Sequence, residues 1–297
     1  MNLKSYLKER AALVDDSMAL LLQDKSVYPD VIHEAMRYSV FAGGKRIRPV
    51  MCLAAAEALG KESSHLLPVA CALEMIHTYS LIHDDLPAMD NDDYRRGKLT
   101  NHKVFGEGVA VLAGDALLTK AFEVLAGFGC AAPAGMMPIV LQVIKEIALA
   151  SGTNGMIGGQ VVDLQSEGKE IDTKTLQYIH THKTGALFIT SIRSGALLSE
   201  ASEQELTALT GYAKNFGLAF QITDDLLDIL GDAEKIGKPV GSDIKNGKGT
   251  YPALYGVERS KILALEAVEE AVSNLKALPG YTKPLELLAR FLTDRES

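Results

Sequence analysis

Apolar residues recur with helical spacing along most of this 297-residue chain, and the alternation typical of β-strands is scarce. The breaks between these segments carry glycine or proline, as at Gly43–Gly44, Gly60 and Pro133. Helices are predicted at 3–23, 30–42, 46–59, 65–85, 109–127, 137–149, 154–165, 172–198, 203–231, 259–276 and 283–293. No Pro-, Gly- or Ser-rich linker and no repeat divides the sequence. One all-α domain over residues 1–297, a bundle of long helices, is therefore predicted.

Two helix starts and one interruption have recognisable chemistry. Asp172 and Ser202 are expected to be N-caps, because their side-chain oxygens can accept free first-turn N–H groups. Thr184 and Gly185 are expected to mark a local break within the helix predicted at 172–198.

Composition and charge indicate which binding partners and which cellular compartment to expect. Apolar residues make up 47% and charged residues 23%, as in soluble globular proteins, and the net charge of −8 argues against nucleic acid and anionic membranes as partners. The N-terminus carries charges of both signs, so no secretory signal is expected. Apolar windows such as MMPIVLQVIKEIALA look too short or too charged to span a bilayer. Cys52, Cys71 and Cys130 lack paired or metal-ligand spacing, which indicates buried thiols in a reducing cytoplasm.

Two acidic clusters interrupt apolar helical stretches: DDLPAMD at Asp84–Asp90 and DDLLD at Asp224–Asp228. A buried carboxylate is costly unless it is paired or metal-bound. Clusters rich in hard oxygen ligands suit Mg²⁺, which typically sits between carboxylates and substrate phosphates. The two clusters therefore predict an enzyme that handles diphosphates.

The second cluster occupies one side of its predicted helix. Gln221, Asp224, Asp225 and Asp228 follow the i, i+3, i+4, i+7 spacing, while the rest of the circumference is apolar. We expect a buried helix whose polar stripe faces an internal cavity. The alternative is an ordinary solvated acidic face, but three carboxylates within two turns repel one another and favour a bound cation.

The first cluster shows a related pattern. His77, Ser80 and Asp84 share a helical face. Asp90 lies six residues beyond Asp84, but Pro87 should distort or end the helix and swing Asp90 back beside Asp84. His77 is either a satisfied core histidine or a functional residue beside this cluster.

Basic residues lie near both clusters. GGKRIRP (43–49) places Lys45, Arg46 and Arg48 at a glycine turn, and RRGK (95–98) follows the first cluster. HKTG (182–185) and the lysine-rich segment 237–251 complete the set. Each segment alone could be a solvated surface turn, but together with the acidic clusters they predict phosphate binding, to which arginine is well suited.

The ordered motifs GGKRIRP, HDDLPAMDNDDYRRG, GGQVVDL, HKTG, GLAFQITDDLLD and GKPVGSD, from Gly43 to Asp243, resemble those of the trans-type polyprenyl diphosphate synthases. The two extra residues in DDLPAMD, relative to DDxxD, are similar to the bacterial farnesyl diphosphate synthase branch. The resemblance implies the prenyl synthase fold, with helices around a central cavity, and a homodimer. It also implies Mg²⁺-dependent head-to-tail condensation of isopentenyl diphosphate with dimethylallyl and geranyl diphosphates, giving farnesyl diphosphate.

The resemblance implies a role for each matching residue. Three Mg²⁺ ions would be coordinated by Asp84, Asp90 and Asp224, supported by Asp85, Asp225 and Asp228. The allylic diphosphate would be held by Arg95, Lys183 and Lys238, and isopentenyl diphosphate by Lys45, Arg48, His77 and Arg96. The reacting carbons would face Thr184 and Gln221, and Lys248 would belong to a lid over 237–251.

Chain length is expected to depend on the residues just before the first cluster. Tyr79 precedes Asp84 by five residues, which places it about 7.5 Å further back along a helix. Ser80 is small, so Tyr79 is predicted to be the floor of the product cavity. A geranylgeranyl diphosphate synthase of the same family is the alternative.

Other classes fit the motifs less well. A terpene cyclase usually replaces the second DDxxD motif and lacks the isopentenyl-binding basic set. A non-catalytic helical subunit would be expected to lose one aspartate cluster, and a head-to-head condensing enzyme would not need GGKRIRP. Both aspartate clusters and GGKRIRP are present here.

Overall fold

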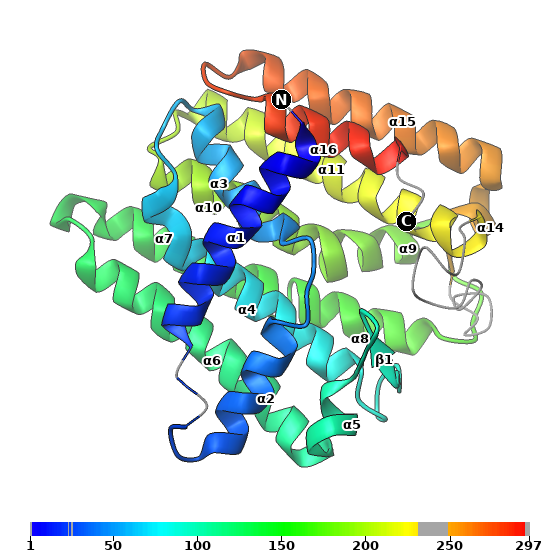
Figure 1. Cartoon of the computed structure of the whole chain (residues 1–297). Helices are drawn as coiled ribbons and strands as arrows, with labels where there is room; N and C mark the ends of the chain where they lie inside the picture. The colour runs from blue at the N-terminus through cyan, green and yellow to red at the C-terminus, as the bar shows by residue number, and fades with distance from the viewer. Residues whose placement is uncertain (1, 23, 25, 231–248, 295–297) are drawn as a thin grey trace. The chain divides into compact units, whose positions relative to one another are not determined.

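The computed structural model describes residues 2–22, 24, 26–230 and 249–294. It is 78% helical, which confirms the all-α prediction. The elements are α1 (Leu3–Leu21), α2 (Asp30–Val40), α3 (Ile47–Ala58), η1 (Ser64–Leu66), α4 (Leu67–Asp84), β1 (Tyr94–Arg95), β2 (Lys98–Leu99), α5 (Asn101–Phe105), α6 (Glu107–Ala131), η2 (Ala134–Met136), α7 (Met137–Ser151), α8 (Met156–Ser166), α9 (Thr173–Ile179), η3 (His180–Gly185), α10 (Ala186–Leu198), α11 (Glu203–Leu230), α14 (Tyr251–Tyr255), α15 (Val257–Asn274), η4 (Leu275–Ala277) and α16 (Lys283–Asp294) (Figure 1).

Most helix boundaries agree with the sequence prediction. The Asp172 side chain accepts the Thr175 N–H at 2.8 Å, and Ser202 exchanges hydrogen bonds with Glu205, so both predicted N-caps are confirmed. The predicted end of a helix at 127 is wrong, because α6 continues to Ala131. At Gly129 an added Cβ would lie 3.1 Å from a methyl group of Val140 in α7, so this glycine allows α7 to pack closely against α6.

Contacts divide the chain into two compact units. Among the described residues, the N-terminal unit comprises those within 2–53 and 63–144, and the C-terminal unit comprises 54–62, 145–230 and 249–294. That both units form one domain remains a prediction.

In the N-terminal unit, α4 packs on α6 and α1, and α2 packs on α6. Its core contains fully buried side chains such as Val14, Leu73, Ile76 and Leu117. This burial fixes α4, and with it the orientation of the acidic turn that follows.

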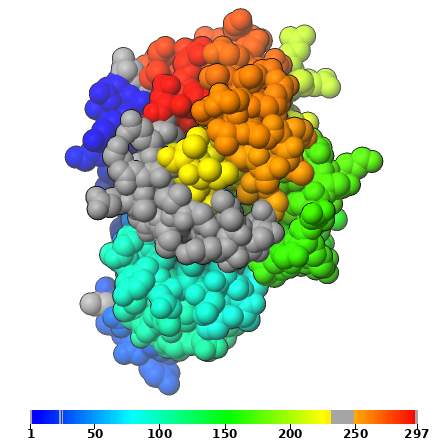
Figure 2. Space-filling model, turned by 90° about the vertical axis from the view of Figure 1, so that its right-hand side faces the viewer, coloured from blue at the N-terminus to red at the C-terminus, as the bar shows by residue number. Residues whose placement is uncertain are grey.

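In the C-terminal unit, α11 packs on α10 and α15, and α15 packs on α16. Figure 2 shows α15 and α16 side by side at the surface. Phe188 and Phe216 meet edge to face at 5.1 Å, and the buried Tyr212 hydroxyl donates to the Leu285 carbonyl at 2.8 Å. These contacts fix the long helix α11, whose last turns carry the second acidic cluster.

Two helical segments, Ser64–Asp84 and Ala134–Ser166, are long and apolar enough to cross a membrane by length and composition. The prediction that the apolar windows are too short or too charged is therefore wrong. In the first segment 67% of the apolar window is buried, as in the core helix of a globular protein. In the second segment 22% of the apolar window is buried, and a turn at 152–155 interrupts the helix.

Candidate active site

The first aspartate cluster forms a tight turn at the end of α4. The helix ends at Asp84, and Pro87 follows three residues later. The Asp90 N–H then donates to the Asp84 carbonyl at 2.8 Å. The predicted distortion that brings Asp90 back to Asp84 is therefore present in the backbone.

The buried Asp85 and the partly exposed Arg95 form an ion pair beside this turn. Asp85 is 3% exposed, and Arg95 Nε donates to its two carboxylate oxygens at 2.7 and 2.9 Å. Burial lowers the Arg95 pKa, but the bonds and charge of Asp85 outweigh it and raise the pKa overall. Arg95 is thus tied to the acidic turn.

Arg48, His77 and Arg96 form a cluster of two arginines and one histidine in the N-terminal unit. Burial, opposed by Glu74 and reinforced by Arg96, lowers the pKa of Arg48 to about 10. Burial and then the charges of Arg48 and Arg96 hold the pKa of His77 well below its usual range. His77 is therefore uncharged near neutral pH, and the two like-charged guanidinium groups of Arg48 and Arg96 create a site that favours an anion.

Lys45 is exposed at the neighbouring Gly43–Gly44 turn. The structure thus gathers the four residues predicted to hold isopentenyl diphosphate, Lys45, Arg48, His77 and Arg96, into the same unit.

The face predicted for the first cluster is confirmed. His77, Ser80 and Asp84 are each partly exposed, whereas Ile76 and Ile82 are buried. Tyr79 is 5% exposed and packs edge to face on His83 with ring centres 5.7 Å apart. Its buried hydroxyl has no hydrogen-bond partner among the described residues. Tyr79 is thus not a core tyrosine satisfied by its described neighbours, and its role in chain length stays a prediction.

In the C-terminal unit, HKTG forms the end of a π-helical turn, η3, where a simple break was expected. Such turns widen the helix and often occur at functional sites. Lys183 Nζ donates to Asp163 of α8 at 2.6 Å, and the Thr184 hydroxyl donates to Gln221 Oε1 of α11 at 3.1 Å. The predicted pair Thr184 and Gln221 is thus brought together.

Asp163 was assigned no role from the sequence. The signal was its place in GGQVVDL, one of the quoted motifs. An added Cβ on Gly159 would overlap the backbone of Lys183, so the glycine of this motif lets α8 approach the turn closely. Glu74 and Asp15, which bind Arg46, were also missed.

The aspartates of α11 do not behave as one stripe. Asp224 is exposed and Asp228 is partly exposed, but Asp225 is buried. Asp225 Oδ2 accepts the Tyr251 N–H at 2.8 Å and lies 4.0 Å from His180 Nε2. The prediction of a buried helix with its whole stripe on an internal cavity is therefore wrong for Asp224. Adjacent helical residues point about 100° apart, which separates Asp224 from Asp225.

The remaining predicted positions have different outcomes. Lys238 and Lys248 lie outside the described residues. Cys52 and Cys71 are buried as expected, but Cys130 is exposed, so that prediction is wrong for the third cysteine.

Within the described residues, no three His, Cys, Asp or Glu side chains converge as a metal site. Mg²⁺ usually takes only one or two carboxylates and completes its shell with water and phosphate. The oxygen donors of Asp84 and Asp90, joined through their backbones, fit that requirement.

Comparisons with known proteins agree with these features. The polyprenyl synthetase profile matches residues 29–278. The chain is 49% identical over 300 residues to the geranylgeranyl diphosphate synthase of Cyanophora paradoxa, covering 100% of this chain and 97% of the relative. It is 47% identical over 277 residues to the farnesyl diphosphate synthase of Geobacillus stearothermophilus, covering 93% and 92%.

Solved structures support the same assignment. The crystal structure of geranylgeranyl pyrophosphate synthetase from Pyrococcus horikoshii Ot3 matches with a TM-score of 0.88 at 35% identity, covering 99% of this chain and 98% of that one. The identity and coverage together leave one conclusion: the chain belongs to the polyprenyl synthetase family.

Proposed function

We propose that this protein condenses isopentenyl diphosphate head to tail with dimethylallyl diphosphate and then geranyl diphosphate, giving (2E,6E)-farnesyl diphosphate. The cluster of Arg48, His77 and Arg96 carries the proposal, because the like charges of Arg48 and Arg96 favour an anion such as a diphosphate beside the uncharged His77 ring. A second set, Lys183 with Thr184 and Gln221, fits the allylic substrate.

The chemistry assigns a task to each set. Ionisation of an allylic C–O bond requires neutralisation of the charge that grows on the leaving diphosphate. Mg²⁺, with three ions proposed per site, would supply that charge when held by Asp84, Asp90 and Asp224, with Asp85 and Asp228 in support. Arg95 and Lys183 are the proposed ligands of the allylic diphosphate, and each is paired with a carboxylate in the structure, Asp85 and Asp163 respectively.

The reacting carbons would meet a polar pair and not a charged base. The Thr184 hydroxyl and the Gln221 amide, 3.1 Å apart, present oxygen dipoles that would stabilise a developing allylic cation. The isopentenyl double bond attacks that cation, and the proton lost from the adjacent carbon passes to the departing diphosphate.

The product is proposed to contain fifteen carbons because the buried ring of Tyr79 lies five residues before Asp84. A geranylgeranyl diphosphate synthase is the second candidate, since the Cyanophora paradoxa relative carries that name. The purified protein should be incubated with dimethylallyl diphosphate, isopentenyl diphosphate and Mg²⁺, and the dephosphorylated products separated by gas chromatography. Farnesol as the main product supports the proposal, whereas geranylgeraniol as the main product would transfer it to the second candidate.

We also propose a homodimer in the cytoplasm. Helix α7 exposes three large apolar side chains, Met137, Leu141 and Leu149, which a second copy would cover. The free thiols of Cys52, Cys71 and Cys130 fit a reducing compartment. Light scattering coupled to size exclusion should give twice the chain mass, and a monomer at micromolar concentration would contradict the dimer.

A further inference from the structure

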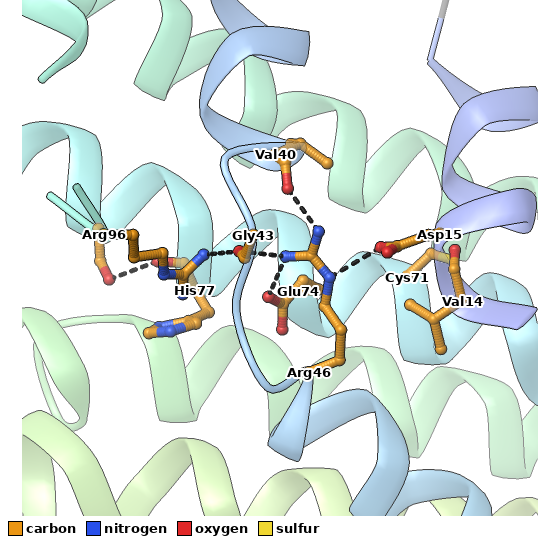
Figure 3. Close-up of polar contacts among 10 residues, drawn as sticks. Val14, Asp15, Val40, Gly43, Arg46, Cys71, Glu74, His77 and Arg96 are labelled. Atoms are coloured by element: carbon orange, nitrogen blue, oxygen red, sulfur yellow. Dashed lines mark hydrogen bonds and ion pairs between the residues drawn. The ribbon is translucent and has the colours of Figure 1, made fainter. Parts of the chain in front are cut away.

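Arg46 lies in the middle of GGKRIRP, yet it does not face a ligand site. Its side chain is 2% exposed, and all three guanidinium nitrogens donate to groups of the protein (Figure 3). Nε donates to Asp15 of α1 at 2.8 Å, and Nη1 donates to Glu74 of α4 at 3.0 Å. Nη2 donates to the Val40 carbonyl at the end of α2 at 2.6 Å. Arg46 therefore joins three helices.

The same guanidinium also contacts the glycine turn that precedes it. Arg46 Nη1 donates to the Gly43 carbonyl at 3.3 Å, and Arg96 Nη1 donates to that same carbonyl from the other side (Figure 3). At Gly44, an added Cβ would lie 2.6 Å from Arg96 Nη1. The conformation of the Gly43–Gly44 turn thus determines where the Arg96 guanidinium lies.

The electrostatic surroundings of Arg46 differ from those of its basic neighbour Arg96. Burial lowers its pKa, but Glu74 and Asp15 outweigh that effect and raise the pKa above its ordinary value. For Arg96 the balance is reversed: burial and the charges of Arg46 and Arg95 outweigh Glu74 and lower the pKa. Arg46 is thus neutralised by two carboxylates of the protein, whereas the Arg96 environment favours an additional anion.

We propose that Arg46, held by Asp15 and Glu74, is a positioning residue for the isopentenyl diphosphate site, where it fixes the Gly43–Gly44 turn and through it Arg96. The inference rests on the proposed function, because it concerns the same site. Arg46 does not touch the substrate. Its contribution is to fix the position of Arg96, which would touch the substrate.

The test compares two arginine variants by calorimetric titration with isopentenyl diphosphate and by steady-state kinetics. Arg46→Met should weaken isopentenyl diphosphate binding on the order of tenfold, because displaced binding groups lose affinity without leaving the site. The KM for geranyl diphosphate should stay within about twofold and kcat within about threefold, as for a loss confined to one substrate's binding. The affinity of Arg46→Lys for isopentenyl diphosphate should lie between those of the unaltered protein and Arg46→Met, since one ammonium group cannot reproduce the hydrogen bonds of the planar guanidinium.

Arg37 provides the matched control. It also donates to backbone carbonyls, those of Ala19 and Leu22, and its guanidinium lies 5.0 Å from the centre of the Phe41 ring. No bond joins it to the Gly43 carbonyl among the described contacts. Arg37→Met should lower the melting temperature without changing the affinity for isopentenyl diphosphate.

Asp15→Asn keeps the test decisive if Arg46→Met does not fold. The Asp15 side chain is 43% exposed, so the fold should tolerate its loss of charge. This variant should weaken isopentenyl diphosphate binding by about two- to fivefold, as for one weakened hydrogen bond to a charged group. Unchanged affinity in every folded variant, or equal rises in KM for both substrates, would overturn the proposal. If the unaltered protein bound no isopentenyl diphosphate at all, the proposed function itself would fail.

Discussion

His180 should make the free energy of unfolding of the C-terminal unit depend on pH. Burial, opposed by Asp163 and reinforced by Lys183, lowers its pKa to about 4 from an ordinary value of 6.5. Between these values the unfolded chain binds a proton that the folded chain excludes, so stability falls as the pH decreases. pH 5 lies one and a half units below the ordinary pKa of 6.5, and each unit is worth about 1.4 kcal/mol. The free energy of unfolding should therefore be about 2 kcal/mol lower at pH 5 than at neutral pH.

Urea unfolding of the unaltered protein and of His180→Gln, each at pH 7.5 and pH 5, measures this contribution. Between pH 7.5 and pH 5, the free energy of unfolding of His180→Gln should fall by about 2 kcal/mol less than that of the unaltered protein, because glutamine does not titrate. His182→Gln is the control from the same turn, since that ring stacks on Tyr178 at 3.8 Å and is only partly buried. Equal losses in His180→Gln and in the unaltered protein would refute the burial of a neutral His180.

Four further outcomes follow from the site. Chelation should abolish condensation and Mg²⁺ should restore it, with Ca²⁺ a poor substitute because it prefers longer bonds and more ligands; full turnover after chelation contradicts the metal role. Asp84→Ala and Asp224→Ala should each reduce kcat by several orders of magnitude with the circular dichroism unchanged, and a variant that keeps more than about a tenth of kcat removes that aspartate from the mechanism. Arg96→Ala and Lys45→Ala should raise the KM for isopentenyl diphosphate roughly tenfold, because both side chains are exposed, and this rise should lie well above any change for the allylic substrate; equal changes would mean that the two diphosphate sites are exchanged. Tyr79→Ala should shift the main product to twenty carbons or more by chromatography, and unchanged farnesol would place the cavity floor elsewhere.

Local patterns predicted the helices well, because period and capping are properties of short segments. Asp172 caps its helix through its own side chain, so three residues of sequence suffice to predict it. The return of Asp90 to Asp84 followed from the backbone restriction that Pro87 imposes. The meeting of Thr184 with Gln221 came from the family resemblance and not from spacing.

Contacts between distant segments could not be read in the same way. The Lys183–Asp163 pair depends on how closely α8 approaches the π-helical turn, and local periodicity does not encode that distance. Whether Asp224 or Asp225 faces inward depends on where α14 packs, because the Tyr251 N–H selects Asp225. The role of Arg46 likewise requires helices α1 and α4 to meet at one guanidinium.

The stoichiometry of diphosphate release tests most directly whether this chain elongates prenyl diphosphates. Inorganic diphosphate and remaining isopentenyl diphosphate should be measured together during turnover with dimethylallyl diphosphate and Mg²⁺. Head-to-tail condensation predicts one diphosphate released for each isopentenyl diphosphate consumed, and no sustained release when isopentenyl diphosphate is left out. Continued release from the allylic substrate alone, as in a cyclase or a hydrolase, would contradict the proposed reaction.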